Sequence, residues 1–115
     1  MSTQNPVIRV LIVEDEPAAA EALALHVGRM PGFGVAGHVS TGADALRRVV
    51  AGGVDLVLLD IYLPDMSGLE VLRRLRAAGL TVDVVATTRA RDLSVVQAAV
   101  SFGVTQYLVK PFTSA

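Results

Sequence analysis

Residues 54–68 read VDLVLLDIYLPDMSG, and this stretch decides the fold. Its first part, Val54–Leu59, is a mostly apolar run that is typical of a parallel strand buried on both faces. The run ends at Asp60, and the residues from Pro64 to Gly68 have the composition of a loop that leads into a helix. A buried strand that ends on a carboxylate indicates an α/β protein with a functional group at the carboxyl edge of its sheet.

Four further segments have strand composition, and helical segments separate them. The expected strands are Val7–Val13, Phe33–Val39, Val82–Thr87 and Thr105–Val109, with the glycine-interrupted Phe33–Val39 at the sheet edge. The first two expected helices are Glu16–Met30 and one that is capped by Thr41 and runs to about Ala51. A third ends at Gly79, and its residues Arg73, Arg74 and Arg76 are expected to face water. A fourth runs from Asp92 or Ser94 to Gly103. This alternation predicts a doubly wound parallel sheet with helices on both faces.

Reactive side chains follow four of the five expected strands, at the point where each strand ends. They are Glu14 and Asp15, Asp60, Thr88, and Lys110. Because groups at the carboxyl ends of parallel strands gather in one crevice, we expect these side chains to form one site. Three carboxylates, a hydroxyl and an ammonium suit a divalent cation together with a phosphoryl group. Strand alternation lets only one of Thr87 and Thr88 face this site.

The composition narrows the class of protein. A chain of 115 residues fits one domain, and 52% hydrophobic residues can fill a core. The sequence has no cysteine, no apolar run of the ~20 residues that a membrane span needs, and no signal-peptide pattern at its N-terminus. Its net charge of −1 argues against nucleic-acid binding by this domain itself. We therefore expect a cytoplasmic protein with no membrane partner, in which residues 1–6 form a flexible lead-in.

These positions together resemble the response-regulator receiver domain of two-component signalling. The resemblance rests on the acidic pair Glu14-Asp15, on Asp60, Pro64 and Gly68 at a spacing of four plus four, and on Lys110-Pro111 about 50 residues after Asp60. The wording DIYLPDMSGLEVL, with YLVKPF later, is most similar to the regulators paired with citrate- and dicarboxylate-sensing kinases. The resemblance implies a flavodoxin-like sheet of five parallel strands in the order 2-1-3-4-5.

The resemblance also implies a role for each site residue. Asp60 accepts a phosphoryl group from a sensor histidine kinase. Mg²⁺ binds to Asp15, to Asp60 and to the backbone carbonyl of Tyr62, while Glu14 assists, often through a water. Gly68 lets the loop after Asp60 approach closely.

Three further residues are implied to respond to the phosphoryl group. Lys110, aimed into the site by a cis bond to Pro111, pairs with the phosphoryl oxygens. Thr88, which is selected over Thr87 by its spacing of 22 residues from Lys110, donates a hydrogen bond to them. Tyr107 then changes rotamer, and partners read the altered surface.

The expected domain covers residues 7–115 and stops five residues after Lys110, before the last helix of such a fold. We therefore expect the last helix and a downstream DNA-binding output domain to be absent from this chain. The expected partners are the kinase and either the output domain or a second copy of the domain. The chain is not expected to be an enzyme beyond self-phosphorylation from small donors and autodephosphorylation.

Other functions fit the sequence less well. A phosphatase of the haloacid dehalogenase type needs a second acid two residues after the nucleophile, where this chain has Tyr62. A flavin carrier needs a phosphate-binding Ser/Thr/Gly loop after the first strand and aromatics that sandwich the ring, whereas this chain has Glu14-Asp15-Glu16-Pro17 there and no Trp. A degenerate receiver that only binds proteins stays open. At Arg89 the family usually has a small residue, so this arginine is expected to shield the acyl phosphate from water, to contact phosphoryl oxygens, or to be exposed with no role. His26 and His38 lack metal-ligand spacing.

Overall fold

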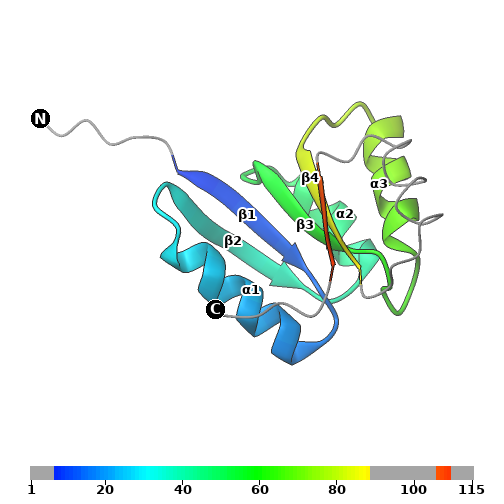
Figure 1. Ribbon diagram of the computed structural model, residues 1–115. Coiled ribbons are helices and arrows are strands. Elements are labelled where there is room, and N and C mark those ends of the chain that lie inside the picture. Colours follow the sequence, from blue (N-terminus) through cyan, green and yellow to red (C-terminus); the bar gives the residue numbers. More distant parts are fainter. Residues whose placement is uncertain (1–6, 89–105, 110–115) are drawn as a thin grey trace, which may run out of the picture.

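The computed structural model describes the backbone of residues 7–88 and 106–109 and the side chains of residues 7–87. The strands are β1 (Ile8–Val13), β2 (Phe33–Val39), β3 (Leu56–Asp60), β4 (Asp83–Thr88) and β5 (Gln106–Val109). The helices are α1 (Pro17–Arg29), α2 (Gly42–Val50) and α3 (Gly68–Ala77) (Figure 1). The predicted fourth helix and the lead-in of residues 1–6 lie outside the described residues.

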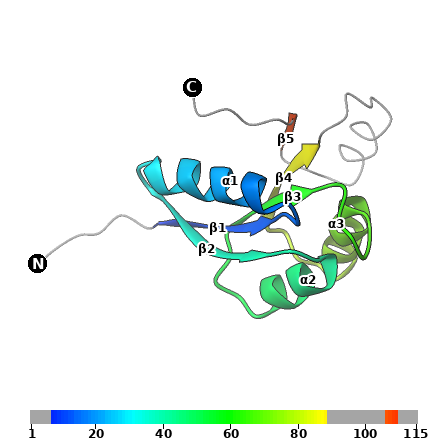
Figure 2. The ribbon, with the colours of Figure 1, turned by 90° about the horizontal axis from the view of Figure 1, so that it is seen from below.

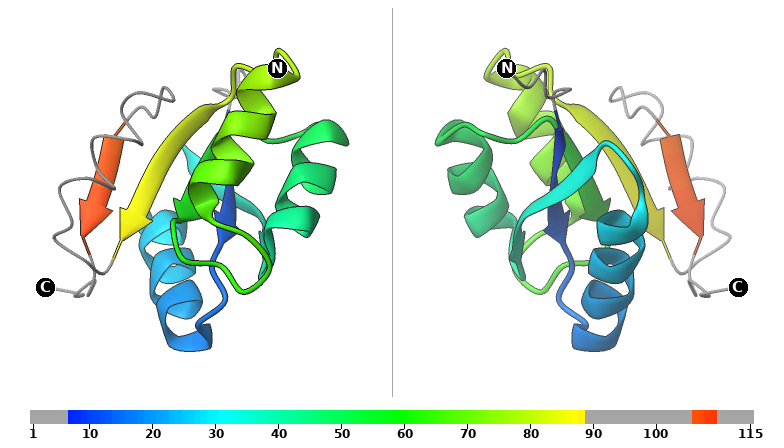
Figure 3. Two further views of the ribbon diagram at one scale, coloured as in Figure 1. Left: turned by 90° about the vertical axis from the view of Figure 1, so that its right-hand side faces the viewer. Right: turned by 90° about the vertical axis from the view of Figure 1, so that its left-hand side faces the viewer.

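The strands form one parallel sheet in the order β2-β1-β3-β4-β5. This arrangement confirms the predicted α/β class, the order of the first four strands and the place of β2 at the edge. All strands run toward the same end of the sheet, where the segments that follow β1 and β3 leave it (Figure 3). The last residue pair between β1 and β3 is Val13 with Leu59, so Glu14 and Asp60 follow at the same level.

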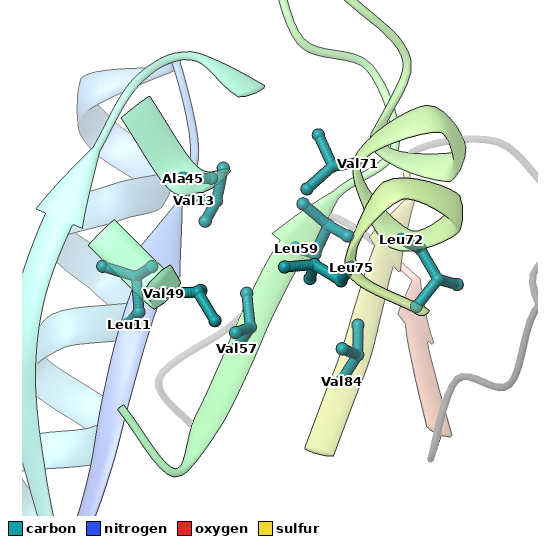
Figure 4. Close-up of a cluster of buried hydrophobic side chains, with 10 residues drawn as sticks. All are labelled: Leu11, Val13, Ala45, Val49, Val57, Leu59, Val71, Leu72, Leu75 and Val84. Atoms are coloured by element: carbon teal, nitrogen blue, oxygen red, sulfur yellow. The ribbon is translucent and has the colours of Figure 1, made fainter. Parts of the chain in front are cut away.

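Helices cover both faces of the sheet, as predicted. Helix α1 lies on one face, and α2 and α3 lie on the other (Figure 2). Alternate residues of each central strand therefore enter different cores. The larger core joins strand residues to α2 and α3 (Figure 4), and consists of Leu11, Val13, Ala45, Val49, Val57, Leu59, Val71, Leu72, Leu75 and Val84. The smaller one, under α1, consists of Val10, Ile12, Ala20, Leu23, Val27 and Leu58.

The third strand begins later and ends later than the sequence indicated. The prediction was Val54–Leu59, whereas β3 starts at Leu56 and includes Asp60. Asp55 explains the late start, because it is linked to β1 before the ladder begins. The Asp55 carboxylate accepts a hydrogen bond from the backbone N–H of Arg9 (2.8 Å), and the Asp55 N–H donates to the Arg9 carbonyl (2.9 Å).

Local signals set the helix ends. The Thr41 hydroxyl accepts a hydrogen bond from the Asp44 N–H (3.1 Å), which confirms it as the cap of α2. Gly79 follows α3 with a φ of 78°, a left-handed conformation that favours glycine and ends the helix. No helix in the described part of the chain is both long and apolar enough to cross a bilayer.

One of the three arginines predicted to face water does not. Arg73 and Arg74 are exposed, and their hydrogen bonds lower the pKa of Glu70 to about 2. Arg76 is instead half-buried, and its Nη1 donates to the carbonyl oxygens of Leu80 and Val82 (both 2.9 Å). The prediction for Arg76 was wrong because helical periodicity shows which face a residue occupies but not that a following segment folds back over it.

Candidate functional site

Three carboxylates meet where β1 and β3 end. Glu14 and Asp15 follow β1 directly, and Asp60 is the last residue of β3. Each can place an oxygen within 4.8 Å of the corresponding oxygens of the other two. The structure therefore brings together the three acidic side chains that the sequence assigned to one crevice.

The burial of this acidic cluster indicates a need for positive charge. Glu14 and Asp60 have no exposed surface, whereas Asp15 is exposed and connects the cluster to solvent. Two ionised carboxylates held close together and out of water repel each other and lose hydration. Carboxylate oxygens are the ligands that hard divalent cations prefer. The donor set and its burial thus fit a cation such as Mg²⁺.

Backbone amides fix the rotation of both buried carboxylates. The Tyr62 N–H donates to Asp60 Oδ1 (3.0 Å), and the Glu16 N–H donates to Glu14 Oε2 (3.0 Å). Each bond reaches from two residues further along the chain, which is a common pattern for a carboxylate at a turn. One oxygen of each carboxyl group is therefore oriented before any ligand arrives.

Gly68 lets the start of α3 approach the end of β3. A Cβ atom at this position would lie 2.2 Å from the Asp60 carbonyl oxygen and 2.8 Å from Cα of Ile61. The Gly68 N–H also donates to the Ile61 carbonyl (2.7 Å). Because both obstacles are backbone atoms, no side chain can move aside to make room. The close approach that the sequence predicted for Gly68 is confirmed.

Asp65 ties the loop after Asp60 to a second helix. Its Oδ1 accepts from the Gly42 N–H (2.8 Å) and its Oδ2 from the Ala43 N–H (3.0 Å), at the beginning of α2. These hydrogen bonds lower the pKa of Asp65 and satisfy amides that have no partner within the helix. No sequence pattern predicts this contact, because the paired residues lie 22 and 23 positions apart.

The neighbouring threonines occupy different positions at the end of β4. Thr87 pairs with Asp60 in the sheet, and its carbonyl accepts from the Ile61 N–H (3.0 Å). Its side chain is buried, and its hydroxyl has no hydrogen-bond partner within the described residues. Thr88 is the last residue of β4 and pairs with Val109. The Thr88 side chain lies outside the described part.

The remaining predicted site residues are placed only in part. The backbone of Tyr107 lies in β5 and pairs with Ala86 of β4, while its side chain is outside the described residues. Lys110, Pro111 and Arg89 also fall outside them. Tyr62, the expected source of a carbonyl ligand, is described and has an exposed side chain.

Sequence reasoning overlooked His38. Its Nε2 lies 2.8 Å from the carbonyl oxygen of Glu14, at the acidic cluster. An isolated histidine on an edge strand carries no spacing signal that would have revealed this contact.

The fold and the site define a class of signalling domain, and comparison with known proteins gives the family. The family model described as the response regulator receiver domain matches residues 10–115. The chain therefore belongs to the response regulator receiver domain family. A solved DNA-binding response regulator of the LuxR family from Staphylococcus aureus has a TM-score of 0.86 at 26% identity, over 93% of this chain and 89% of that one.

Two relatives confirm the expected similarity to regulators of citrate and dicarboxylate systems. The chain is 36% identical over 110 residues to the "Probable C4-dicarboxylate response regulator DctR" of Halalkalibacterium halodurans, covering 96% of this chain and 48% of that protein. It is 38% identical over 105 residues to the transcriptional regulatory protein CitT of the same organism, covering 90% and 46%. The chain thus spans about half the length of these relatives.

Proposed function

We propose that this chain is a phospho-acceptor receiver, in which Asp60 takes a phosphoryl group from a sensor histidine kinase in a reaction that requires Mg²⁺. The observation that carries the proposal is the meeting of Asp60 with Glu14 and Asp15 within 4.8 Å at the carboxyl edge of the sheet. Membership of the receiver family supports the same assignment.

The reaction needs a nucleophile held in place and negative charge neutralised. One carboxylate oxygen of Asp60 attacks phosphorus, the phosphorus–nitrogen bond of the donor histidine breaks, and its electron pair leaves with the imidazole. The Tyr62 N–H orients the Asp60 carboxyl group for this attack. Bound Mg²⁺ supplies charge neutralisation, and Asp15, Asp60 and the Tyr62 carbonyl would hold it with help from Glu14.

The switch that follows rests on residues at the ends of β4 and β5. Phosphorylation adds about two negative charges at Asp60. We infer that Lys110 contacts the phosphoryl oxygens, that Thr88 donates a hydrogen bond to them, and that Tyr107 changes rotamer as Thr88 moves. These assignments derive from the family resemblance, and they require the complete five-stranded receiver with β5 beside β4.

The relatives suggest what the switch controls. DctR and CitT are about twice as long as this chain, and CitT is named a transcriptional regulator. We infer that the phosphorylated domain acts in the cytoplasm on a DNA-binding output domain or through a second copy of itself. The domain itself, with a net charge of −1, does not bind the DNA. Its own chemistry is limited to self-phosphorylation from small donors and autodephosphorylation.

One observation favours a rival function, that of a degenerate receiver that only binds other proteins. Asp60 has no exposed surface, so a phosphoryl donor reaches it only if neighbouring segments move. The two functions differ in one respect that can be measured directly, which is covalent modification of Asp60.

Treatment with acetyl phosphate and Mg²⁺, followed by intact-protein mass measurement, separates them. We expect a gain of about 80 Da, one phosphoryl group, in the wild type and in Asp83→Asn, a matched change at the exposed start of β4. Asp60→Asn should gain nothing, because an amide oxygen is a poor nucleophile. A folded wild-type protein that gains no mass under these conditions would favour the degenerate receiver.

A further inference from the structure

We propose that His38 is a positioning residue for the acidic cluster, holding the peptide bond between Glu14 and Asp15 so that both carboxylates face one cation. The inference rests on the proposed function and deepens it, because it adds a side chain on the edge strand β2 to the machinery of the metal site. The observation that carries it is the distance of 2.8 Å between Nε2 of His38 and the Glu14 carbonyl oxygen.

The direction of this hydrogen bond follows from its acceptor. A carbonyl oxygen can only accept, so Nε2 of His38 carries the hydrogen. In a neutral imidazole this assigns the tautomer and leaves Nδ1 without a hydrogen. The His38 residue is exposed, while its hydrogen bond with the Glu14 carbonyl is partly buried.

The end of the β1–β2 ladder explains why a side chain is needed here. Val13 pairs with Val39, and the Glu14 N–H still donates to the Val39 carbonyl (3.0 Å). The N–H and C=O groups of one strand residue point to the same side, so the Glu14 carbonyl also points toward β2. Strand β2 ends at Val39, and the chain turns away toward α2. The imidazole of His38 supplies the donor that the backbone N–H of Thr41 would supply if the parallel ladder continued.

Fixing this carbonyl has a consequence for the metal site. The peptide group is planar, so holding the Glu14 carbonyl also fixes the Asp15 N–H and the direction in which the chain passes Cα of Asp15. Glu14 and Asp15 lie on either side of this peptide, and both belong to the group of oxygens that lie within 4.8 Å. A rotation of the peptide would therefore turn one carboxylate away from Asp60.

A Mg²⁺ titration followed by backbone amide chemical shifts of residues 14–16 and 60–62 tests the inference without relying on phosphorylation. Removal of an outer partner of a metal ligand weakens metal binding on the order of 10- to 100-fold. Because His38 acts through the backbone, we expect the lower end of that range, about tenfold weaker binding, in His38→Leu. His38→Gln should stay within about twofold of the wild type, since its side-chain amide restores the donor.

Two controls separate positioning from a general loss of stability. His26→Leu changes the other histidine of the chain, which lies on α1, and should leave the Mg²⁺ dissociation constant unchanged. His38→Val is a second variant without a donor, and valine suits an edge strand. In the donor-free variants, the Mg²⁺ concentration that gives half-maximal phosphorylation by acetyl phosphate should rise together with the Mg²⁺ dissociation constant.

The possible outcomes distinguish this inference from the proposed function. Wild-type affinity for Mg²⁺ in a folded donor-free variant overturns the role of His38 alone. If His38→Gln binds Mg²⁺ as weakly as His38→Leu, the role of His38 is also overturned, because the lost hydrogen bond would then not be the cause of the weaker Mg²⁺ binding. No Mg²⁺ response in the wild type overturns the proposed function and this inference with it.

Discussion

The loops that follow β1 and β3 both present acidic side chains to the same site, yet they are held in different ways. The loop after β3 is fixed by backbone packing, since Gly68 brings α3 against the Asp60 carbonyl, and by Asp65, which caps α2. The loop after β1 is held by hydrogen bonds that Glu14 makes with Glu16, His38 and Val39, and α1 begins without a side-chain cap. Backbone packing therefore holds the phospho-acceptor Asp60 in place. The position of Glu14 and Asp15 depends instead on hydrogen bonds that a substitution can remove and another can restore.

The largest effect is expected from a substitution at Gly68, where backbone packing holds the loop after β3. Gly68→Ala places a methyl group 2.2 Å from a backbone oxygen, so the free energy of unfolding should fall by about 3 kcal/mol or more. Gly28→Ala, near the end of α1, is the matched control, because a Cβ atom at this position would meet nothing within 4 Å. Urea unfolding measures both. Equal losses in the two variants would contradict a special role for the approach of α3.

Mg²⁺ binding tests the loop after β1, which contributes Glu14 and Asp15 to the acidic cluster. A cation that binds only the folded state stabilises it, by about 1.4 kcal/mol at ten times its dissociation constant. We expect Mg²⁺ to raise the melting temperature of the wild type and to have little effect on Asp15→Asn, which loses a ligand. Asp44→Asn, on α2, serves as the control and should respond like the wild type. An equal response of Asp15→Asn would place the bound ion elsewhere.

The Asp65 cap should make stability depend on pH. Its folded-state pKa lies below the ordinary value of 3.8, so its ionised form stabilises the fold above that value. This contribution is lost as pH falls through the lowered folded-state pKa. Asp65→Asn should therefore be less stable than the wild type at pH 7, and the difference should shrink toward pH 3. Urea unfolding at the two pH values measures it; a constant difference would show that the charge of Asp65 is unimportant.

The smallest expected effects compare two arginines of α3. Arg76→Ala removes two bonds to carbonyls before β4 and should lower the free energy of unfolding by about 1 kcal/mol. Arg73 pairs with Glu70 in solvent, and Arg73→Ala should be indistinguishable from the wild type at moderate salt. A larger effect of Arg73→Ala than of Arg76→Ala in urea unfolding would reverse the order that burial implies.

Local patterns predicted most of the described fold. Apolar runs gave the central strands, Thr41 and Gly79 gave helix ends, and Asp60 at a strand end located the site. These features depend on neighbours in sequence and on the geometry of parallel sheets, which requires strand ends to share an edge.

The features that the sequence did not predict correctly depend on contacts between residues far apart in the chain. Asp55 delayed β3 through contacts with Arg9, and Asp65 and His38 reach partners more than twenty residues away. A sequence pattern records which face of a strand or helix a residue occupies, but it does not record which loop packs against that face. Long-range hydrogen bonds of single polar side chains therefore became visible only in the folded chain.

The most direct test of the central claim is to locate the phosphoryl group on the chain. After reaction with acetyl phosphate and Mg²⁺, borohydride reduces an aspartyl phosphate to homoserine, and peptide mass mapping then identifies the modified residue. We expect homoserine at position 60 only, with none at Asp15 and no reduced product at Glu14. Modification at one of those two residues, or no modification of a folded protein, would contradict the assignment of Asp60 as the acceptor held between metal ligands.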